Sequence, residues 1–489
     1  MDLKKQVTQG AIWVFLDQFG VQLVSFLVSL VLARLLMPAD FGTIALFNVV
    51  INVSSVLING GLSSSLVRTQ AVDNRDLSTV FWFNIVMTLL LYLVIFIASP
   101  WIARFYTMPI LSPIIRVYSI VLIIDSFVHV QAVLFDKNLD FKTTFKVRLP
   151  SIVVGGLCGV GFALAGFGVW SLVYSALIQN ALYTIQYWFY SDWRPTFEFD
   201  REKFRYHFAF GFRLTLSALL NVLFNNIYSI VIGKRFAETT LGYYNRAESL
   251  KNLPINNVST ALNKVTYPLF AKFSDDDEKL RNAYRQVLKL VIFIVAPLIC
   301  IMMIAAEPII GLLLGEKWLP VVPYFQILAL GALFQPIHNY NLNILQVKGR
   351  ADLYLRLEVI KKLLIIVAVV LGLRFGIYGL LWGQVAVSVA SLFINTFYTA
   401  KFLKYAMLQQ LADLMPSILI ACGIAALIWW GSDLLLLDLQ IWAKALVLVA
   451  SYVLAFWWFC SLIQLEEYKS IKDLVKNNWQ KKNGVINRN

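Results

Sequence analysis

Long apolar stretches, repeated along the whole chain, limit the fold more than any other feature of this sequence. A helix needs about 20 apolar residues to cross the hydrocarbon core of a bilayer. Charged or proline-containing breaks separate fourteen such stretches, and with 59% hydrophobic residues the chain is too apolar for a soluble core. The sequence predicts an all-α integral membrane protein with fourteen transmembrane helices, at about 11–33, 43–63, 78–98, 112–135, 149–167, 169–190, 207–232, 243–271, 290–306, 320–345, 357–373, 379–400, 411–431 and 440–463.

The distribution of basic residues predicts the orientation in the membrane. Most of the 42 Lys and Arg residues fall in even-numbered loops and at the termini if the amino terminus is cytoplasmic. Basic loops favour the cytoplasmic side, so we expect both termini there. The net charge of +14 is scattered over short loops instead of forming one patch, which argues against nucleic acid as a partner.

One stretch of the sequence occurs twice, exactly once in each half of the chain. VLARLLMPADFGTIAL begins at Val31, and VIGKRFAETTLGYYNR begins 200 positions later at Val231, with Gly42 aligned to Gly242. Six predicted helices precede residue 207 and six occupy 207–400, as in transporters that are built from paired repeats. The eighth segment, 243–271, is too polar to be predicted from hydropathy alone, and it is included because it aligns with the apolar second segment. We therefore predict two six-helix bundles and an appended pair, with the divisions 1–200, 201–405, 406–463 and a basic cytoplasmic tail at 464–489.

Two predicted helices carry polar side chains on one face, at steps of three or four residues. In the eighth segment the face runs from Glu248 to Asn263, and in the seventh from Arg213 to Ser229. Polar groups facing lipid tails would be unsatisfied, so these faces should turn toward other helices or a water-filled cavity. Interhelical hydrogen bonding is one interpretation; the other is a transport role for the amides on and beside these faces, Asn221, Asn225, Asn252, Asn256 and Asn263.

Arg213, in the seventh segment, and Lys264, in the eighth, are cations within these two polar helices. Ionisable groups inside membrane spans are costly and usually functional. Both residues lie toward the predicted cytoplasmic ends of their helices, so extension of the side chains to the lipid headgroups is the competing interpretation.

Three further ionisable residues are candidates for ion coupling. Asp125 and His129 lie four residues apart near the middle of the fourth segment, and Asp17 lies in the first. A buried carboxyl–imidazole pair can bind and release a proton, because burial and proximity shift both pKa values. A hydrogen-bonded pair that only joins two helices is the alternative.

Motifs for cofactor or metal chemistry are not found in the sequence. There is no G-x-x-x-x-G-K-[ST] loop, and the three His and four Cys residues have no spacing typical of a metal site. We therefore expect no cofactor, no metal and no enzymatic activity.

Three segments, ARLLMPADFG, YPLFAKFSDDDEKLRNAY and GEKWLP, carry a resemblance to a known family. Together with the repeat and the appended pair, the chain resembles the polysaccharide-transporter family of the multidrug/oligosaccharidyl-lipid/polysaccharide exporter superfamily, and within it the colanic-acid-exporter type of bacterial oligosaccharide flippase. The likeness covers essentially the whole chain. It implies a V-shaped pair of six-helix bundles around a cavity that alternates between the two faces of the bacterial inner membrane.

The same resemblance implies the substrate. Members turn a sugar chain, linked through diphosphate to undecaprenol, from the cytoplasmic to the periplasmic leaflet for surface-polysaccharide biosynthesis, and polysaccharide polymerase machinery is a further candidate partner. Members generally have cationic cavities that suit the diphosphate. The residues here that fit are Arg213 and Lys264, with Arg246 and Lys251 as weaker additions, whereas Asp17 departs from a purely basic lining. For such a substrate, we expect the sugar hydroxyl groups to contact the amides Asn221, Asn225, Asn252, Asn256 and Asn263.

The sequence is also compatible with two other functions. One is a multidrug or small-molecule exporter with the same fold, driven by a cation gradient. The other is a scaffold or membrane enzyme for polysaccharide assembly, although the sequence offers no embedded set of acid and base residues for such an enzyme.

Overall fold

The computed structural model describes residues 13–59, 61–70, 72–435, 439–469 and 472–473, with side chains at all of these except 213, 256–265 and 433–435. All the elements that these residues form are helices. Packing divides the chain into two compact units, Met1–Asn245 and Arg246–Asn489. The boundary predicted after residue 200 comes from aligning the two halves of the sequence. The division into packed units does not test it, so it stays a prediction.

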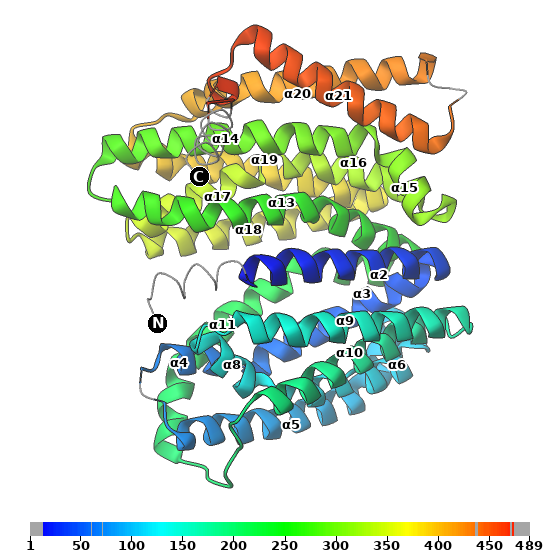
Figure 1. The fold of residues 1–489 in the computed structure, drawn as a ribbon, viewed down its shortest axis with the longest axis vertical. Helices are drawn as coiled ribbons and strands as arrows, with labels where there is room; N and C mark the ends of the chain where they lie inside the picture. Colours follow the sequence, from blue (N-terminus) through cyan, green and yellow to red (C-terminus); the bar gives the residue numbers. More distant parts are fainter. Residues whose placement is uncertain (1–12, 60, 71, 436–438, 470–471, 474–489) are drawn as a thin grey trace, which may run out of the picture. The chain divides into compact units, whose positions relative to one another are not determined.

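The first unit is built on the long helices α3, α5, α9, α10 and α11 (Figure 1). Helix α9 packs against α2 and α10, while α11 packs against α3, α4 and α5. The elements are a π-helical turn η1 (Asp17–Val21), α2 (Gln22–Leu35), α3 (Pro38–Asn59), α4 (Leu62–Arg68), α5 (Asn74–Tyr106), α6 (Leu111–Tyr118), α7 (Ile120–Ser126), α8 (His129–Lys137), α9 (Phe141–Leu164), α10 (Val169–Tyr190), α11 (Arg201–Asn225), α12 (Ile227–Arg235) and the start of α13 (Glu238–Lys272).

In the second unit, α14 packs against α20, and α19 packs against α16, α17 and α18. The elements after α13 are α14 (Asp277–Ile304), α15 (Ala306–Leu314), η2 (Glu316–Trp318), α16 (Val321–Ala332), α17 (Gln335–Val347), α18 (Ala351–Gly372), η3 (Leu373–Phe375), α19 (Gly376–Leu403), α20 (Met407–Leu435) and α21 (Ile441–Ile463).

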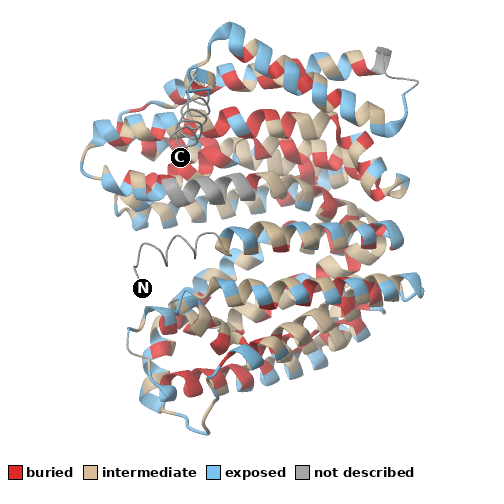
Figure 2. Cartoon of the chain, viewed as in Figure 1, coloured by how far each residue is buried: buried red, intermediate tan, exposed pale blue. Residues whose placement is uncertain are grey.

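The core of the second unit follows α14, in which most residues from Val291 to Cys300 are buried (Figure 2). Tyr284, Leu288, Val291 and Val295 are all buried, at steps of four, three and four residues that place them on one helical face. At the start of this helix the Arg285 guanidinium makes two hydrogen bonds of 2.5 Å to the Asp413 carboxylate of α20. Helix α20, the first helix of the appended pair, is thus held to α14 by a bidentate ion pair as well as by packing.

Ten helices among the described residues are long and apolar enough to cross a membrane, or eleven if the bent pair Leu111–Ser126 and His129–Lys137 is one span. All fourteen predicted segments fall on helices. The number falls short of fourteen partly because α10 and α13 are too polar to qualify, and because Ala351–Leu403 counts as one helix. The protein is a multi-pass membrane protein, whereas fourteen crossings and cytoplasmic termini stay predictions.

The two copies of the repeated stretch meet at Gly42 and Gly242, inside the first unit. A Cβ added to Gly42 would lie 1.9 Å from the carbonyl oxygen of Glu238, and one added to Gly242 would lie 2.0 Å from the carbonyl oxygen of Pro38. Pro38 and Glu238 are also 200 positions apart, so the contact is the same in both directions. Backbones approach this closely only where side chains are absent, which explains why both copies have glycine here.

Candidate functional site

A break in a membrane helix creates the candidate site in the first unit. The sequence predicts one continuous helix over 112–135, whereas in the structure α7 ends at Ser126, α8 begins at His129, and the two parts are bent by 44°. Such a break exposes backbone carbonyl groups that a continuous helix would pair internally. Discontinuous membrane helices are common at the binding sites of transporters.

Side chains from α10 satisfy the carbonyl groups at this break. The Thr184 hydroxyl donates to the carbonyl oxygen of Ile124 at 3.2 Å, and the Trp188 indole N–H donates to that of Phe127 at 3.0 Å. Backbone polar groups without a partner are expensive inside a membrane. The two α10 side chains therefore allow the fourth segment to bend where it has neither proline nor glycine.

A polar cavity of about 290 Å³ lies beside the break. The structure brings Asp125 and His129 to this one cavity, although they belong to different helices and not to one continuous face. The other walls come from α9 and α10. The cavity is lined by Asp125, Val128, His129, Ala132, Arg148, Ser151, Ile152, Gln179, Asn180 and Tyr183.

Arg148 is the cation among the residues that line this cavity, and its ion pair with Asp17 connects that residue to the cavity. Helix α9 begins at Phe141, after Asp140 accepts a hydrogen bond from the backbone N–H of Thr143 at 3.1 Å. Arg148 therefore lies two turns inside the helix, and its Nη1 donates to Asp17 Oδ2 at 2.7 Å. The Arg148 side chain is 42% exposed and that of Asp17 is 17% exposed.

This ion pair leaves hydrogen-bonding capacity unused on both partners. Asp17 Oδ1 is buried and has no hydrogen-bond partner among the described residues. The Arg148 guanidinium has five N–H groups, and one of them, at Nη1, is used on Asp17. A second anion could therefore bind to Arg148 without first breaking a complete network.

The cavity walls also carry neutral hydrogen-bonding groups. Gln179 and Asn180 come from α10, and the Asn180 side-chain N–H donates to the carbonyl oxygen of Ala176 at 2.9 Å, a bond that does not use its own side-chain carbonyl oxygen, which is an acceptor. Ser151 accepts a hydrogen bond from Gln186 at 2.9 Å. An amide and hydroxyl lining of this kind is suited to polar ligands such as sugars.

None of the described side chains predicted to bind diphosphate or sugar lines this cavity. Arg246 is buried, with its guanidinium carbon 5.2 Å from the centre of the Trp318 ring, and Lys251 pairs with Glu248 at 3.6 Å. Asn221 and Asn225 are exposed on α11, and Asn252 is half-buried on α13. The side chains of Arg213, Asn256, Asn263 and Lys264 lie outside the part of the chain whose side chains the structure describes.

Sequence reasoning missed Arg148, Gln179 and Asn180. Arg148 directly precedes the fifth predicted segment, at 149–167, and so reads as a loop residue. Its partner Asp17 lies 131 positions away. The useful signal was Gln179 and Asn180, a pair of amides in the middle of the sixth segment, because adjacent polar residues in a membrane helix need polar surroundings.

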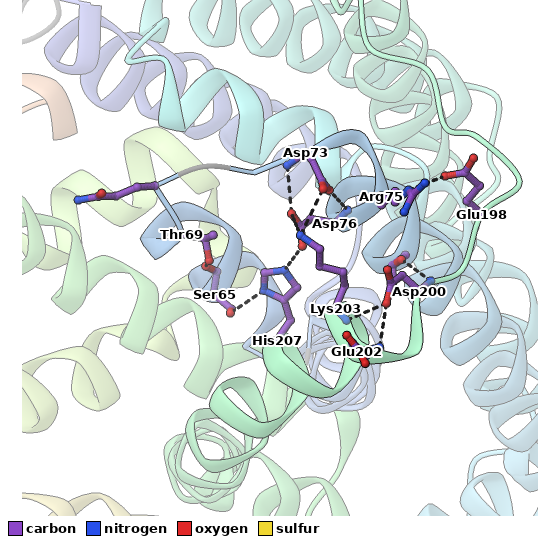
Figure 3. A network of polar contacts seen from close by, with 12 residues as sticks. Ser65, Thr69, Asp73, Arg75, Asp76, Glu198, Asp200, Glu202, Lys203 and His207 are labelled. Atoms are coloured by element: carbon purple, nitrogen blue, oxygen red, sulfur yellow. Dashed lines mark hydrogen bonds and ion pairs between the residues drawn. The ribbon is translucent and has the colours of Figure 1, made fainter.

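A second polar cluster, the His207 network, joins α4, α5 and α11 in the first unit (Figure 3). The His207 ring is fully buried, with Nδ1 2.7 Å from Ser65 Oγ and Nε2 3.2 Å from Asp76 Oδ1. Lys203 donates to Asp76 Oδ2 at 3.1 Å and lies 3.2 Å from Asp73. Both nitrogens of the ring and both oxygens of Asp76 therefore have partners.

The same cluster fixes the start of α5. The backbone N–H of Asp76 donates to Asp73 Oδ1 at 2.8 Å, and that of Asp73 donates to Asp76 Oδ2 at 3.0 Å, which forms a capping box. The hydrogen bond from the Asp76 N–H is the main reason why the pKa of Asp73 is lowered from 3.8 to about 2. This network has no unused group that points to a ligand.

Comparison with known proteins gives a consistent picture. Residues 31–323 match a family described as polysaccharide biosynthesis protein. The chain is 25% identical over 408 residues to the lipopolysaccharide biosynthesis protein WzxC of Escherichia coli K12, covering 82% of both chains. It is 26% identical over 354 residues to the teichuronic acid biosynthesis protein TuaB of Bacillus subtilis 168, covering 72% of this chain and 73% of that protein.

A similar fold is found in a solved membrane protein. The structure of the lipid II flippase MurJ, in an inward closed conformation, superposes with a TM-score of 0.72 and covers 93% of this chain and all of that one. Only 13% of the aligned residues are identical, so this likeness concerns the fold.

Proposed function

Because this chain belongs to the polysaccharide biosynthesis protein family, we propose that it is a flippase for lipid-linked oligosaccharides. It is a multi-pass protein of the bacterial inner membrane. The proposed substrate is a sugar chain linked through diphosphate to undecaprenol. The proposed direction is from the cytoplasmic to the periplasmic leaflet, by alternating access.

The observation that carries this proposal is the incompletely satisfied Asp17–Arg148 pair at a polar cavity. A diphosphate has several acceptor oxygens and binds the planar guanidinium through two parallel hydrogen bonds. It therefore competes with Asp17, which in this structure engages Arg148 through a single hydrogen bond. In the predicted orientation both residues lie in the cytoplasmic half of the membrane. The proposed substrate starts in the cytoplasmic leaflet, so it would reach them from that side.

The polar faces of α11 and α13 supply further proposed contacts. Arg213 and Lys264 are proposed to attract the diphosphate at the cytoplasmic side, where attraction grows as water is excluded. Ser217, Asn221 and Asn225 are exposed along α11, and polar side chains exposed at membrane depth are stable only beside a water-filled space. We propose that this face, with the amides of α13, hydrogen-bonds sugar hydroxyl groups, and that Pro254 lets α13 bend.

Ion coupling is proposed for Asp125, His129 and Asp17. The first two share the cavity with Arg148, and Arg148 holds Asp17. When the substrate binds Arg148, Asp17 loses its counter-charge, and its carboxylate is free to bind the coupling cation. Binding of the anionic substrate and uptake of a cation would then be linked through one arginine.

Loss of the gene in its host tests the function directly. Lipid-linked sugars should accumulate on the cytoplasmic leaflet, surface polysaccharide should be lost, and the wild-type copy should restore both. Normal polysaccharide with altered drug sensitivity would contradict the flippase and favour a drug exporter. Formation of new sugar linkages by the purified protein would favour an enzyme.

The double variant Arg213→Gln with Lys264→Gln tests the α11 and α13 cations. If they bind the diphosphate, a correctly inserted double variant should fail to restore surface polysaccharide in the deletion strain. Flipping at the wild-type rate would remove both residues from the mechanism and leave Arg148 as the candidate.

A further inference from the structure

An apolar groove lies on the surface of the first unit, beside the break between α7 and α8. Its cavity volume is about 460 Å³, and its walls come from the break and from the end of α10. The wall side chains are unusually exposed for their size: Phe189 is 84% exposed, Ile185 is 50% exposed and Phe127 is 37% exposed. The full lining is Phe127, Thr184, Ile185, Trp188, Phe189 and Arg194.

One cation, Arg194, stands at the rim of this groove. Its guanidinium donates to the carbonyl oxygens of Ser191 at 2.5 Å, Trp193 at 2.8 Å and Trp188 at 2.9 Å. These are carbonyl groups at and just beyond the end of α10, which have no helical partner of their own. The side chain is therefore held in one position by neutral acceptors.

The charge of Arg194 is not balanced by a nearby acid. Among the residues that the structure describes, no carboxylate lies within 4.0 Å of its guanidinium in an ion pair, whereas Arg75 in the same region pairs with Glu198 at 3.5 Å. A fixed, exposed cation beside exposed aromatic and aliphatic side chains matches a ligand with an anionic head and an apolar tail. Trp188 and Trp193 beside it are residues typical of the membrane–water interface.

We propose that this groove binds an anionic phospholipid of the cytoplasmic leaflet, with its phosphate on Arg194 and an acyl chain along Phe127, Ile185 and Phe189. The segment that carries Arg194 is a predicted cytoplasmic loop, and the cytoplasmic leaflet is the one in which anionic lipids attract basic residues. This site is separate from the proposed site for the transport substrate, because the groove and the polar cavity have no lining residue in common.

The groove is connected to the candidate site through its own walls. Trp188 and Thr184 line the groove and also donate the hydrogen bonds that satisfy the carbonyl groups of Phe127 and Ile124. Asp125, which lies between these two carbonyl groups in sequence, faces the polar cavity. A lipid in the groove therefore stabilises the bent form of the fourth segment, and with it the arrangement of the cavity.

Native mass spectrometry of the purified full-length protein, titrated with phosphatidylglycerol or phosphatidylcholine, tests the site. Wild type should retain phosphatidylglycerol preferentially, and Arg194→Gln should weaken this retention about fivefold, the effect of one basic residue at an anionic surface. Arg75→Gln is the matched control, since Arg75 is exposed and already paired. Retention of phosphatidylcholine should not change in either variant.

A second variant separates binding from folding. Phe189→Asn leaves Arg194 intact and alters a side chain that is 84% exposed, so folding should be preserved while the apolar wall is lost. It should weaken retention of both lipids. Soluble glycerol phosphate should compete poorly, because it lacks the acyl chain. Equal phosphatidylglycerol retention in wild type and Arg194→Gln, or an equal loss in Arg75→Gln, would overturn the proposal.

Discussion

The two polar clusters of the first unit differ in how completely their hydrogen bonds are made. In the His207 network, both ring nitrogens and both Asp76 oxygens have partners, and the ring is fully buried. In the cavity, Asp17 Oδ1 has no partner among the described residues, and the Arg148 side chain is 42% exposed. A saturated buried network fixes a structure, whereas an unsaturated and accessible one can exchange partners with a ligand.

The contrast predicts opposite behaviour on mutation. Removing a member of the His207 network should lower stability with little effect on transport by the molecules that fold. Removing a member of the cavity pair should lower transport with little effect on stability.

The largest effect is expected for Asp76→Asn. Asp76 is 2% exposed and carries the charge that balances Lys203 and orients His207, so its loss leaves buried groups without a partner. We expect the free energy of unfolding in detergent to fall by about 3 kcal/mol. Asp73→Asn is the matched control, since that side chain is 55% exposed and asparagine still caps the helix, and it should cost less than about 1 kcal/mol. Equal losses in the two variants would contradict a buried network.

The next largest effect is expected for Arg148→Gln, measured as the flipping rate in reconstituted vesicles. A charge-assisted hydrogen bond contributes about 1.5–3 kcal/mol, so the rate should fall by roughly ten- to a hundredfold. The free energy of unfolding should change by less than about 1 kcal/mol, because the pair is partly exposed. Arg148→Lys should restore part of the rate. A large loss of stability without loss of rate would show that the pair is structural.

Ser65→Ala should have a smaller effect. It removes the partner of His207 Nδ1 and leaves a buried ring nitrogen unsatisfied. The free energy of unfolding should fall by about 1–2 kcal/mol. Thr69→Ala on the same helix is the control, because the Thr69 hydroxyl bonds only to the carbonyl oxygen of Ser65 in its own helix. If Ser65→Ala and Thr69→Ala have the same free energy of unfolding, the contact with His207 does not contribute to stability.

The smallest effect concerns acid stability. The pKa of Asp73 is lowered from 3.8 to about 2 in the folded protein, so its ionised form stabilises the fold above pH 3.8. That contribution is lost as the pH falls from 3.8 toward 2. The unfolding midpoint of wild type should therefore fall slightly more over this range than that of Asp73→Ser, which caps the helix without a titratable group. Parallel acid profiles would indicate that the capping carboxylate contributes nothing.

Much of the helical framework could be predicted from the sequence, because apolar length and polar periodicity are local signals. Even the polar segment 243–271 was predicted as a helix, through its alignment with the second segment, and it lies within α13. Asp125 and His129 were also selected together, and they line one cavity.

The parts that were not predicted depend on contacts between distant residues. The break after Ser126 has no local cause, because the groups that stabilise it, Thr184 and Trp188, lie about 60 positions later. The same holds for Asp17 with Arg148, and for Asp76 with His207, which are each separated by 131 positions. Such pairings follow from the packing of helices, which composition and periodicity do not specify.

The contact between Gly42 and Gly242 has a consequence for the origin of the chain. Each glycine meets the carbonyl group that corresponds to the one its counterpart meets, which is the pattern of an isologous interface in a two-fold symmetric dimer. If the two halves arose by duplication, as the repeat predicts, an ancestral six-helix protein would have made this same contact with a second copy of itself. On this view the fold retains a homodimer interface within a single polypeptide, and the glycines mark where the two subunits once touched.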